Sequence, residues 1–302
     1  MEPKRRTMQK APFVFVLLLI LGCVPEQKLA PENPFIIAEG GKPWIIAHGG
    51  SKALWPENTM MAFDGSAALG VDALEMDVCL TKDSILVTHH DETIDRMSDG
   101  EGKVADYTYK ELLQYNFGDG FTDLDGNQPY LNAPVRITRL DSVMAKYGHF
   151  PFVIEIKDEG KIGERAADVL ERLIEQYDMV NRTIIASFHD EIIEYYLKIS
   201  EEQHYVSTPK KATTKLVLTS RSRTGLLHWP KAVATQVPME SSGIGIDKKR
   251  VVKSVHKHNM AIHYWTINDK DDMKDLIEIG ADGLITDRPD IMIEVLEELG
   301  KL

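Results

Sequence analysis

The stretch that decides the fold reads IIAHGGSK at residues 45–52, LEMD at 74–77 and ILVTHHD at 85–91. In the first and last of these blocks a short apolar run leads into polar residues, and such runs are typical of buried strands. Polar groups that follow the ends of buried strands are how α/β enzymes assemble their active sites. The stretch therefore predicts an α/β enzyme and is expected to hold a large part of its catalytic site.

The same alternation continues along the chain. Short apolar runs predict strands at 44–47, 73–78, 152–156, 183–187, 204–207, 232–237, 261–266 and 283–286. Amphipathic segments predict helices at 58–69, 162–177, 191–199, 248–258, 270–279 and 289–299. Strands that alternate with helices of this length imply a parallel sheet. Eight such strands in about 260 residues favour a (β/α)8 TIM barrel over an open doubly wound sheet.

Two segments depart from this repeat. Residues 93–141 include a polar, glycine-rich run, and we expect a small insertion after the second strand, with a short hairpin and a helix near 108–115. Residues 211–230 are basic and mixed in character. An ordinary barrel helix and a lid are both compatible with that second segment.

The N-terminus carries a targeting signal. Basic residues precede the apolar run 11–21, which suits a secretory signal but is too short to span a bilayer comfortably. The sequence ILGC that ends at Cys23 is similar to a bacterial lipobox, in which the cysteine is lipidated; an ordinary signal peptide or uncleaved anchor is the alternative. We predict a signal peptide at 1–22, a lipidated tether at 23–42 and a barrel at 43–302. The protein is then exported and anchored on the extracytoplasmic face of the cell membrane.

Composition and charge narrow the class of partner. With 302 residues, 43% hydrophobic and 27% charged, the chain has an ordinary globular composition. Its net charge is -12, and no basic face compensates, which argues against a nucleic-acid partner. If Cys23 is acylated, only Cys79 remains, so an intramolecular disulfide is impossible and the core must supply the stability. The oligomeric state stays open.

Three carboxylates are predicted to point into the barrel. Glu75 and Asp77 are two residues apart on one strand, so they share a face, and the same parity turns Glu155 and Lys157 inward. Two carboxylates about 4 Å apart repel by roughly 4 kcal/mol at an effective dielectric near 20, so three together require protons or a cation. Oxygen ligands favour Ca²⁺ or Mg²⁺ over zinc. The structural alternative is ion pairing, for example of Glu155 with Lys157.

His48 and His90 are the natural acid–base pair, because each follows an apolar run. Phosphodiester hydrolysis needs one group to activate the attacking oxygen and one to protonate the leaving alkoxide, and histidine suits both tasks near neutral pH. Which histidine does which is open. His89 is expected to be structural, and Lys52 either supplies positive charge near a phosphate or is an exposed loop lysine.

Glu57 and Asn58 open the first predicted helix. Asn58 is a favourable N-cap residue, and that role alone could explain it. Glu57 carries more functional weight, since the start of this helix is expected beside His48. Cys79 shares the parity of the strand's acids and is expected to be a small buried filler near the barrel mouth.

These residues resemble the glycerophosphodiester phosphodiesterases, which are (β/α)8 barrels with a divalent ion. The matching blocks are AHGG at 47–50, PENT at 56–59, ALEMDV at 73–78, LVTHHDETIDR at 86–96, FVIEIK at 152–157, WTIND at 265–269 and GADGLITDRP at 280–289. The resemblance covers nearly all of 44–299 and implies roles for individual residues. The metal ligands would be Glu75, Asp77 and Glu155, the catalytic base and acid His48 and His90, and the further active-site residues Glu57, Lys157 and Trp265.

One position departs from the family pattern. The family usually has an arginine directly after the first histidine, where it contacts the phosphate, and here Gly49 occupies that place. A bidentate, charge-assisted contact is therefore lost. Lys52 would compensate as a point charge, with less geometric specificity.

The resemblance implies hydrolysis of glycerophosphodiesters to an alcohol and glycerol 3-phosphate. Two alternatives remain: a lysophospholipase D-type activity on lipid substrates, and a catalytically weak phosphodiester-binding lipoprotein that has lost its phosphate arginine. The sequence leaves open which alcohol is preferred and which divalent ion is used. It also leaves open whether water attacks directly or a substrate hydroxyl first forms a cyclic phosphate.

Overall fold

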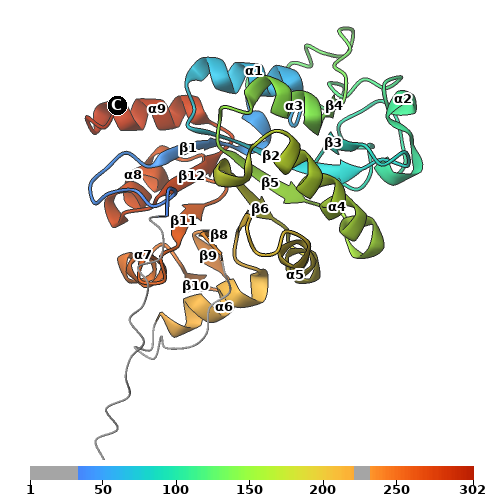
Figure 1. The fold of residues 1–302 in the computed structure, drawn as a ribbon. Coiled ribbons are helices and arrows are strands. Elements are labelled where there is room, and N and C mark those ends of the chain that lie inside the picture. The colour runs from blue at the N-terminus through green and yellow to red at the C-terminus, as the bar shows by residue number, and fades with distance from the viewer. Residues whose placement is uncertain (1–32, 221–231) are drawn as a thin grey trace, which may run out of the picture. The chain divides into compact units, whose positions relative to one another are not determined.

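The computed structural model describes residues 33–220 and 232–302, and it confirms the TIM barrel (Figure 1). Within these residues eight parallel strands form the barrel, in the order β7, β6, β5, β2, β1, β12, β11, β8. They are β1 (Trp44–Ala47), β2 (Ala73–Leu80), β5 (Phe152–Ile156), β6 (Thr183–Ala186), β7 (Tyr205–Val206), β8 (Ala234–Val237), β11 (Ala261–Tyr264) and β12 (Gly283–Thr286). A parallel bridge between Ser207 and Ala234 brings the two ends of this order together.

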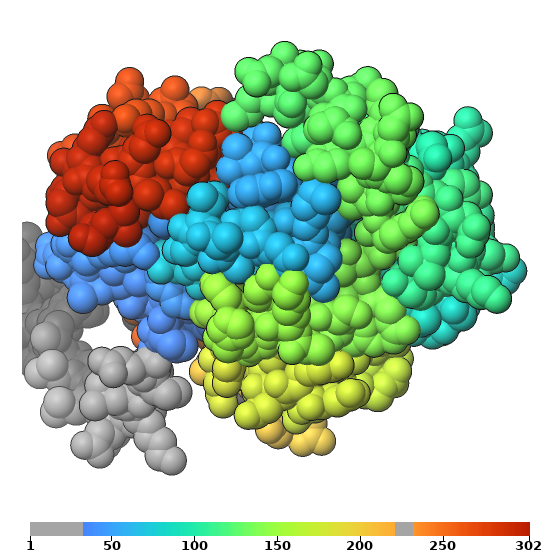
Figure 2. All heavy atoms as spheres, turned by 90° about the horizontal axis from the view of Figure 1, so that it is seen from above, coloured from blue at the N-terminus to red at the C-terminus, as the bar shows by residue number. Residues whose placement is uncertain are grey.

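Helices between the strands surround the barrel. They are α1 (Met60–Leu69), α3 (Leu140–Tyr147), α4 (Gly160–Gln176), α5 (Asp190–Ile199), α6 (Lys210–Thr219), α7 (Lys249–His256), α8 (Lys270–Ile279) and α9 (Pro289–Glu298), with the short turn η3 (Val180–Arg182) before β6. The C-terminal helix α9 packs on β1, and Figure 2 shows the red C-terminal part of the chain beside the blue part that comes early in the sequence. The first part of the segment 211–230 is helical, within α6, which ends at Thr219. Residues 221–231 lie outside the described residues.

Strand parity divides the core as predicted. Leu74, Met76 and Val78 of β2 pack outward in the large cluster beneath the helices. The alternate residues Ala73, Glu75 and Asp77 point toward the barrel axis, where Ala73 packs in a separate interior cluster with Val153 of β5. Alternation of side chains along a strand is the physical cause of this division. The inward-facing acids Glu75, Asp77 and Glu155 are therefore held by the strands themselves, not by loops.

The segment before β1 belongs to the barrel, so the prediction of a tether up to residue 42 is wrong in its last part. Phe35 is 2% exposed and packs into the interior cluster. The Asn33 carboxamide donates to the carbonyl oxygens of Val233 (2.7 Å) and Asn259 (2.8 Å). These contacts lie at the ends where the strands begin. The predicted signal peptide and lipidated Cys23 lie outside the described residues.

The predicted insertion at 93–141 follows β2 and the strand β3 (Leu86–Thr88). Within it lie the short helices η2 (Val104–Asp106) and α2 (Tyr109–Leu112) and the strand β4 (Thr138–Arg139). Both β3 and β4 extend the sheet in antiparallel fashion. An antiparallel bridge between Thr93 and Lys103 closes a hairpin. Cys79 is fully buried in the insertion's own apolar cluster, and His89, with its Nε2 2.9 Å from the carbonyl oxygen of Thr93, is structural as expected.

Within residues 33–220 and 232–302 the helices are too short or too polar to cross a lipid bilayer.

Candidate active site

The three predicted metal ligands meet at the carboxyl end of the barrel. Glu75 and Asp77 of β2 are 5% and 2% exposed, and Glu155 of β5 pairs in register with Asp77. One carboxylate oxygen from each of the three residues lies within 4.8 Å of the other two. Oxygen donors at this spacing suit a hard divalent cation.

This cluster is unfavourable without a cation. Burial and the neighbouring Asp77 raise the pKa of Glu75 to about 8, and the same two causes raise the pKa of Glu155. The Lys157 ammonium lies 3.0 Å from Glu155 and 3.5 Å from Asp77, so the ion pair considered from the sequence is present. Burial opposes its charge, but Asp77 and Glu155 outweigh burial and raise the pKa of Lys157. One ammonium does not balance three carboxylates, so the residues fit a divalent ion.

Asn58 holds Asp77 in place, and its predicted role as helix cap is wrong. Thr59 caps α1 instead, because its side chain accepts from the amide of Ala62. Asn58 takes a φ of 57°, a left-handed conformation that asparagine tolerates better than most residues. Its Nδ2 donates to Asp77 Oδ2 (2.9 Å), and its Oδ1 accepts from the Asp77 amide (3.0 Å). Such partners orient a metal ligand.

His48 is held by a carboxylate from the last strand. It begins the short turn η1 (His48–Gly50), and its Nδ1 lies 2.7 Å from Oδ1 of Asp287, the residue after β12. Asn268 donates to the other oxygen of Asp287 (2.7 Å). Burial disfavours the charged ring, but the Glu75 carboxylate and the bond to Asp287 outweigh it and raise the pKa of His48. Burial likewise disfavours the Asp287 carboxylate, yet His48 holds the pKa of Asp287 below its ordinary value.

The sequence alone did not assign Asp287 and Asn268 to the chemistry. Both lie in the blocks WTIND and GADGLITDRP, in which the resemblance gives a role to Trp265 alone. The available signal was an aspartate directly after a predicted strand, at the barrel end where the other polar groups gather.

His90 has a matching carboxylate partner. Its Nδ1 lies 2.8 Å from Asp91 Oδ1, and Arg96 donates to the other oxygen of Asp91 (2.6 Å). Burial disfavours the Asp91 carboxylate, but Arg96 and His90 hold the pKa of Asp91 below its ordinary value. Glu57 accepts from the second arm of Arg96 and lies outside the cavity wall. Glu57 is thus linked to His90 through Arg96 and Asp91. The Nε2 of His90 lies 3.4 Å from the Lys157 ammonium.

A cavity of about 660 Å³ joins these groups at the barrel mouth. Among the residues that line it are the predicted site residues His48, His90, Glu75, Glu155, Lys157, Lys52 and Trp265. Trp265 makes an edge contact with Phe188, with 5.7 Å between the ring centroids. One flank is apolar: Val217 and Leu218 come from α6, and Ile244 comes from the hairpin of β9 (Glu240–Ser241) and β10 (Ile244–Gly245).

Gly49 stands where the family's arginine is expected. Its φ is +53°, and its amide donates to Glu75 Oε2 (2.6 Å). A Cβ there would lie 3.4 Å from Glu57 Cβ and 3.5 Å from Asn58 Nδ2, which are ordinary contact distances. A side chain therefore has space at this position, although the left-handed backbone disfavours it.

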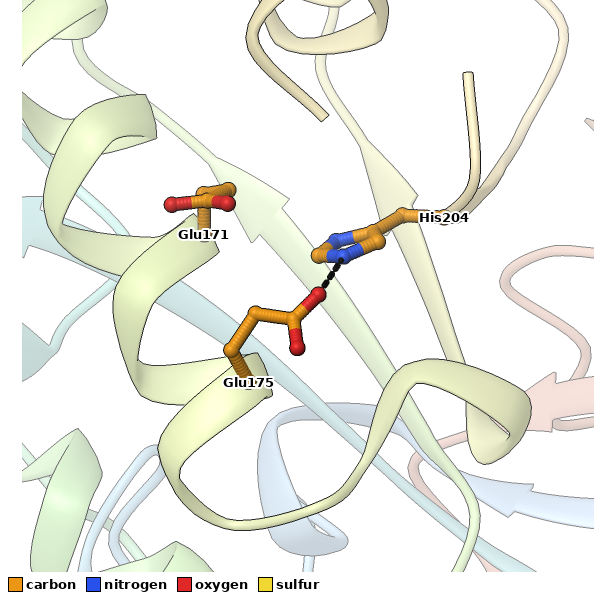
Figure 3. A group of neighbouring side chains, drawn as sticks. All are labelled: Glu171, Glu175 and His204. Carbon is orange, nitrogen blue, oxygen red and sulfur yellow. Dashed lines mark hydrogen bonds and ion pairs between the residues drawn. The ribbon is translucent and has the colours of Figure 1, made fainter. Parts of the chain in front are cut away.

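A second group of acids and a histidine lies away from the cavity. Glu171 and Glu175 are one turn apart on α4 and face His204, which precedes β7 (Figure 3). Nε2 of His204 lies 2.9 Å from Glu175, and its Nδ1 lies 2.8 Å from the Tyr196 hydroxyl. Both ring nitrogens have protein partners, and His204 lies where β7 begins rather than at the mouth. We assign no ligand to this group.

A TIM barrel with an acidic, oxygen-donor cluster and titratable groups at its mouth is the arrangement of a barrel enzyme whose acids could hold a divalent cation. The glycerophosphoryl diester phosphodiesterase family matches residues 48–291, so the chain belongs to that family and is a phosphoric diester hydrolase. The resemblance inferred from the sequence blocks is confirmed. The family generally depends on a divalent ion, and the acidic cluster is where this chain could bind one.

Relatives of known name agree with this assignment. A glycerophosphodiester phosphodiesterase of Caldanaerobacter subterraneus subsp. tengcongensis is 31% identical over 263 residues, which cover 86% of this chain and 100% of that protein. A lysophospholipase D of Homo sapiens is 24% identical over 284 residues, which cover 84% and 85%. An Oleispira antarctica phosphodiesterase, solved with the product sn-glycerol-3-phosphate, has a TM-score of 0.66 at 21% identity, with 84% and 97% coverage. That last likeness supports the fold alone.

Proposed function

We propose that this enzyme hydrolyses glycerophosphodiesters to an alcohol and glycerol 3-phosphate, with His48 and His90 as the proton-transfer groups. The observation that carries the proposal is the pairing of two histidines with carboxylates around one acidic cluster. In both rings Nδ1 faces an aspartate, so Nε2 is the nitrogen available for proton transfer. Both histidines line the cavity that also contains Glu75 and Glu155.

Glu75, Asp77 and Glu155 would hold Ca²⁺ or Mg²⁺. When bound, that ion supplies a Lewis acid that polarises the phosphate and favours ionisation of the attacking hydroxyl. Lys157, beside this cluster, adds positive charge near the phosphate and His90. The aspartates that face the two histidines orient the rings and stabilise their protonated forms.

Lys52 would take over the phosphate contact of the missing arginine. It lines the cavity beside His48, and its ammonium lies 3.8 Å from Asp287 Oδ1. Its side chain is 31% exposed, so the ammonium can reach a ligand that enters from the mouth. Trp265 would lie against the organic part of the substrate.

Release of glycerol 3-phosphate from several glycerophosphodiesters, with and without chelator, tests this function. His90→Asn should abolish release while the thermal midpoint stays nearly unchanged, because His90 is at the surface of the cavity. His149→Asn, a change at an exposed position outside the cavity wall, is the matched control. Full activity of His90→Asn would contradict the proposal. If the wild-type protein binds diesters tightly but does not hydrolyse them, even with added Ca²⁺ or Mg²⁺, a phosphodiester-binding lipoprotein is favoured instead.

The apolar flank of the cavity favours a second candidate, a lysophospholipase D-type activity. Val217, Leu218 and Ile244 could contact a hydrocarbon chain on the leaving group, and Leu218 is 51% exposed. The ratio of rates on a long-chain lysophospholipid and on glycerophosphocholine distinguishes the two substrates. If lipids are the substrates, Leu218→Asp should lower the lysophospholipid rate alone.

We further propose that the protein is an exported lipoprotein anchored through Cys23. The support is the ILGC sequence after a short apolar run, preceded by basic residues. In bacterial cells given a labelled fatty acid, wild-type protein should take up the label and fractionate with membranes. Cys23→Ser should lose both properties. Membrane association of unlabelled Cys23→Ser would point to an uncleaved anchor.

A further inference from the structure

Two polar side chains lie next to each other inside the barrel with unpaired atoms. Gln236 of β8 and His263 of β11 are partners in the parallel register, so their side chains project side by side. Nε2 of Gln236 and both ring nitrogens of His263 are buried, and no hydrogen bond to another described residue satisfies them. Buried polar groups in native proteins nearly always have a hydrogen-bond partner, so these two side chains require a ligand or a water molecule as theirs.

The barrel is shaped to accept this pair. His263 is fully buried, and burial lowers its pKa to about 4, so the ring is neutral at physiological pH. Gly283 of β12 makes room for the ring, because a Cβ there would lie 2.9 Å from His263 Cδ2. The same Cβ would lie 2.9 Å from Ile46 Cδ1. An apolar residue at 263 would avoid the unpaired nitrogens, so packing alone does not account for the histidine.

Gln236 lines the cavity that contains the candidate active site. The wall that includes His48 and Glu75 also includes Val153, Gln236 and Ile285. Val153 lies two residues before Glu155 on β5 and pairs in register with Glu75, so this part of the wall borders the acidic cluster. A ligand bound at the acids would lie in the same cavity as the Gln236 carboxamide.

We infer that Gln236 binds a free hydroxyl of the substrate's glycerol moiety, which makes it a specificity-determining residue for the function proposed above. The leaving alcohol varies between substrates, so the constant glycerol group is the part that a fixed carboxamide in the cavity wall can recognise. A hydroxyl both donates and accepts, so it pairs with either end of a carboxamide. His263, which is absent from the cavity wall, acts through Gln236 as a positioning residue.

Paired substrates that differ by one hydroxyl test this inference. Glycerophosphocholine is compared with two analogues in which 1,2-propanediol or 1,3-propanediol replaces glycerol. A site built to bond a hydroxyl discriminates strongly against an analogue without it, so we expect wild-type kcat/KM to fall at least ~100-fold for one analogue. Gln236→Leu should bring that ratio close to one, because the rate on glycerophosphocholine falls while the rate on the analogue is kept.

Two further variants separate recognition from structure. His263→Leu should reduce the same ratio in part, whereas a purely structural role would change only the thermal midpoint. Thr214→Val, on the cavity wall contributed by α6, should leave the ratio unchanged.

A Gln236→Leu ratio equal to that of wild type would overturn the inference and show that the pair binds water only. The proposed function would survive that result, since glycerophosphocholine would still be hydrolysed. If Gln236→Leu does not fold, the wild-type ratio decides alone, because equal rates on all three substrates also overturn the inference. Absence of hydrolysis of every diester by wild type would instead contradict the proposed function.

Discussion

At the residue scale, the candidate site depends on side chains that hold other side chains. Asp287 fixes His48, Asp91 fixes His90, and Asn58 fixes Asp77. Each partner determines which atom of the catalytic or ligand group faces the cavity. A histidine whose Nδ1 is hydrogen-bonded to a carboxylate has its Nε2 available for proton transfer. The carboxylate therefore determines which ring nitrogen exchanges the proton.

Asp287→Asn should lower kcat by about 10²–10⁴-fold, because the amide cannot stabilise the charged ring of His48 as the carboxylate does. The bond to Asp287 is among the causes that raise the pKa of His48. Its loss should therefore move the His48 limb of the pH profile of kcat/KM to lower pH. Asp290→Asn, which removes a partner of Arg288 on α9, is the control. An unchanged profile would show that Asp287 does not act on His48.

Lys52→Met should reduce kcat/KM by about 10–100-fold, the usual worth of a hydrogen bond to a charged group. Gly49→Arg in the same chain should restore much of that loss, since the guanidinium would return to the phosphate. The left-handed φ of Gly49 should cost the arginine variant ~1–2 kcal/mol of stability.

Steady-state kinetics of the two single variants and the double variant measure this compensation, with the exposed Lys249→Met as control. Independent, additive losses in the double variant would rule Lys52 out as the phosphate contact.

At the element scale, β2 determines the electrostatics of the site. Its alternation places Glu75 and Asp77 inward, and its register with β5 brings Glu155 beside them. The same alternation keeps their apolar neighbours in contact with the helices. The strand therefore gains packing energy on one face and accumulates repulsion on the other. A bound cation would relieve that repulsion.

The free energy of unfolding of the metal-free protein should fall as the pH rises from 4.5 to 8. Folded Glu75 keeps its proton up to about pH 8, whereas in the unfolded chain it releases the proton near its ordinary value of 4.5. The folded state thus binds more protons across this range, and stability decreases with pH.

Urea unfolding in chelator at several pH values measures this slope. Glu75→Gln should flatten it, while Glu278→Gln, at an exposed position on α8, should not. Added Ca²⁺ or Mg²⁺ should restore the stability of the wild type at pH 8. A slope that is identical in Glu75→Gln would assign it to other groups.

At the scale of the whole molecule, the barrel has one end for chemistry and one for stability. The acids, histidines and cavity lie where the strands end, and Phe35 closes the other end together with the first inward residues of the strands. The first and last strands of the barrel, β1 and β12, pair along their whole length. Changes at the closed end should therefore alter stability without altering turnover.

Phe35→Ala should lower the free energy of unfolding by ~3–5 kcal/mol, as is usual for removal of a buried aromatic ring. The kcat should remain within about twofold of wild type below the unfolding transition. Urea unfolding and steady-state kinetics on the same preparations measure both, and Leu302→Ala, at a side chain that is 64% exposed, is the control. A wild-type midpoint in Phe35→Ala would show that the segment before β1 is not part of the folded barrel.

The sequence by itself determined the repeat and the parity. Both are local properties, since an apolar run marks a buried strand and residues two apart share a face. This was enough to predict the eight strands, the inward carboxylates Glu75, Asp77 and Glu155, and the two histidines. Parity also turns Lys157 inward, and the family blocks point to Trp265; both side chains line the cavity.

Only the tertiary structure decided which distant residues meet. Asn58 prefers Asp77 to its helix because the turn before α1 lies against β2, and local propensity does not contain that contact. Asp287 reaches His48 because β12 pairs with β1, although 239 positions separate the two residues. Gln236 and His263 become neighbours through the register of β8 and β11. The physical reason is the same in each case: strand register across a closed sheet is set by the packing of the whole barrel.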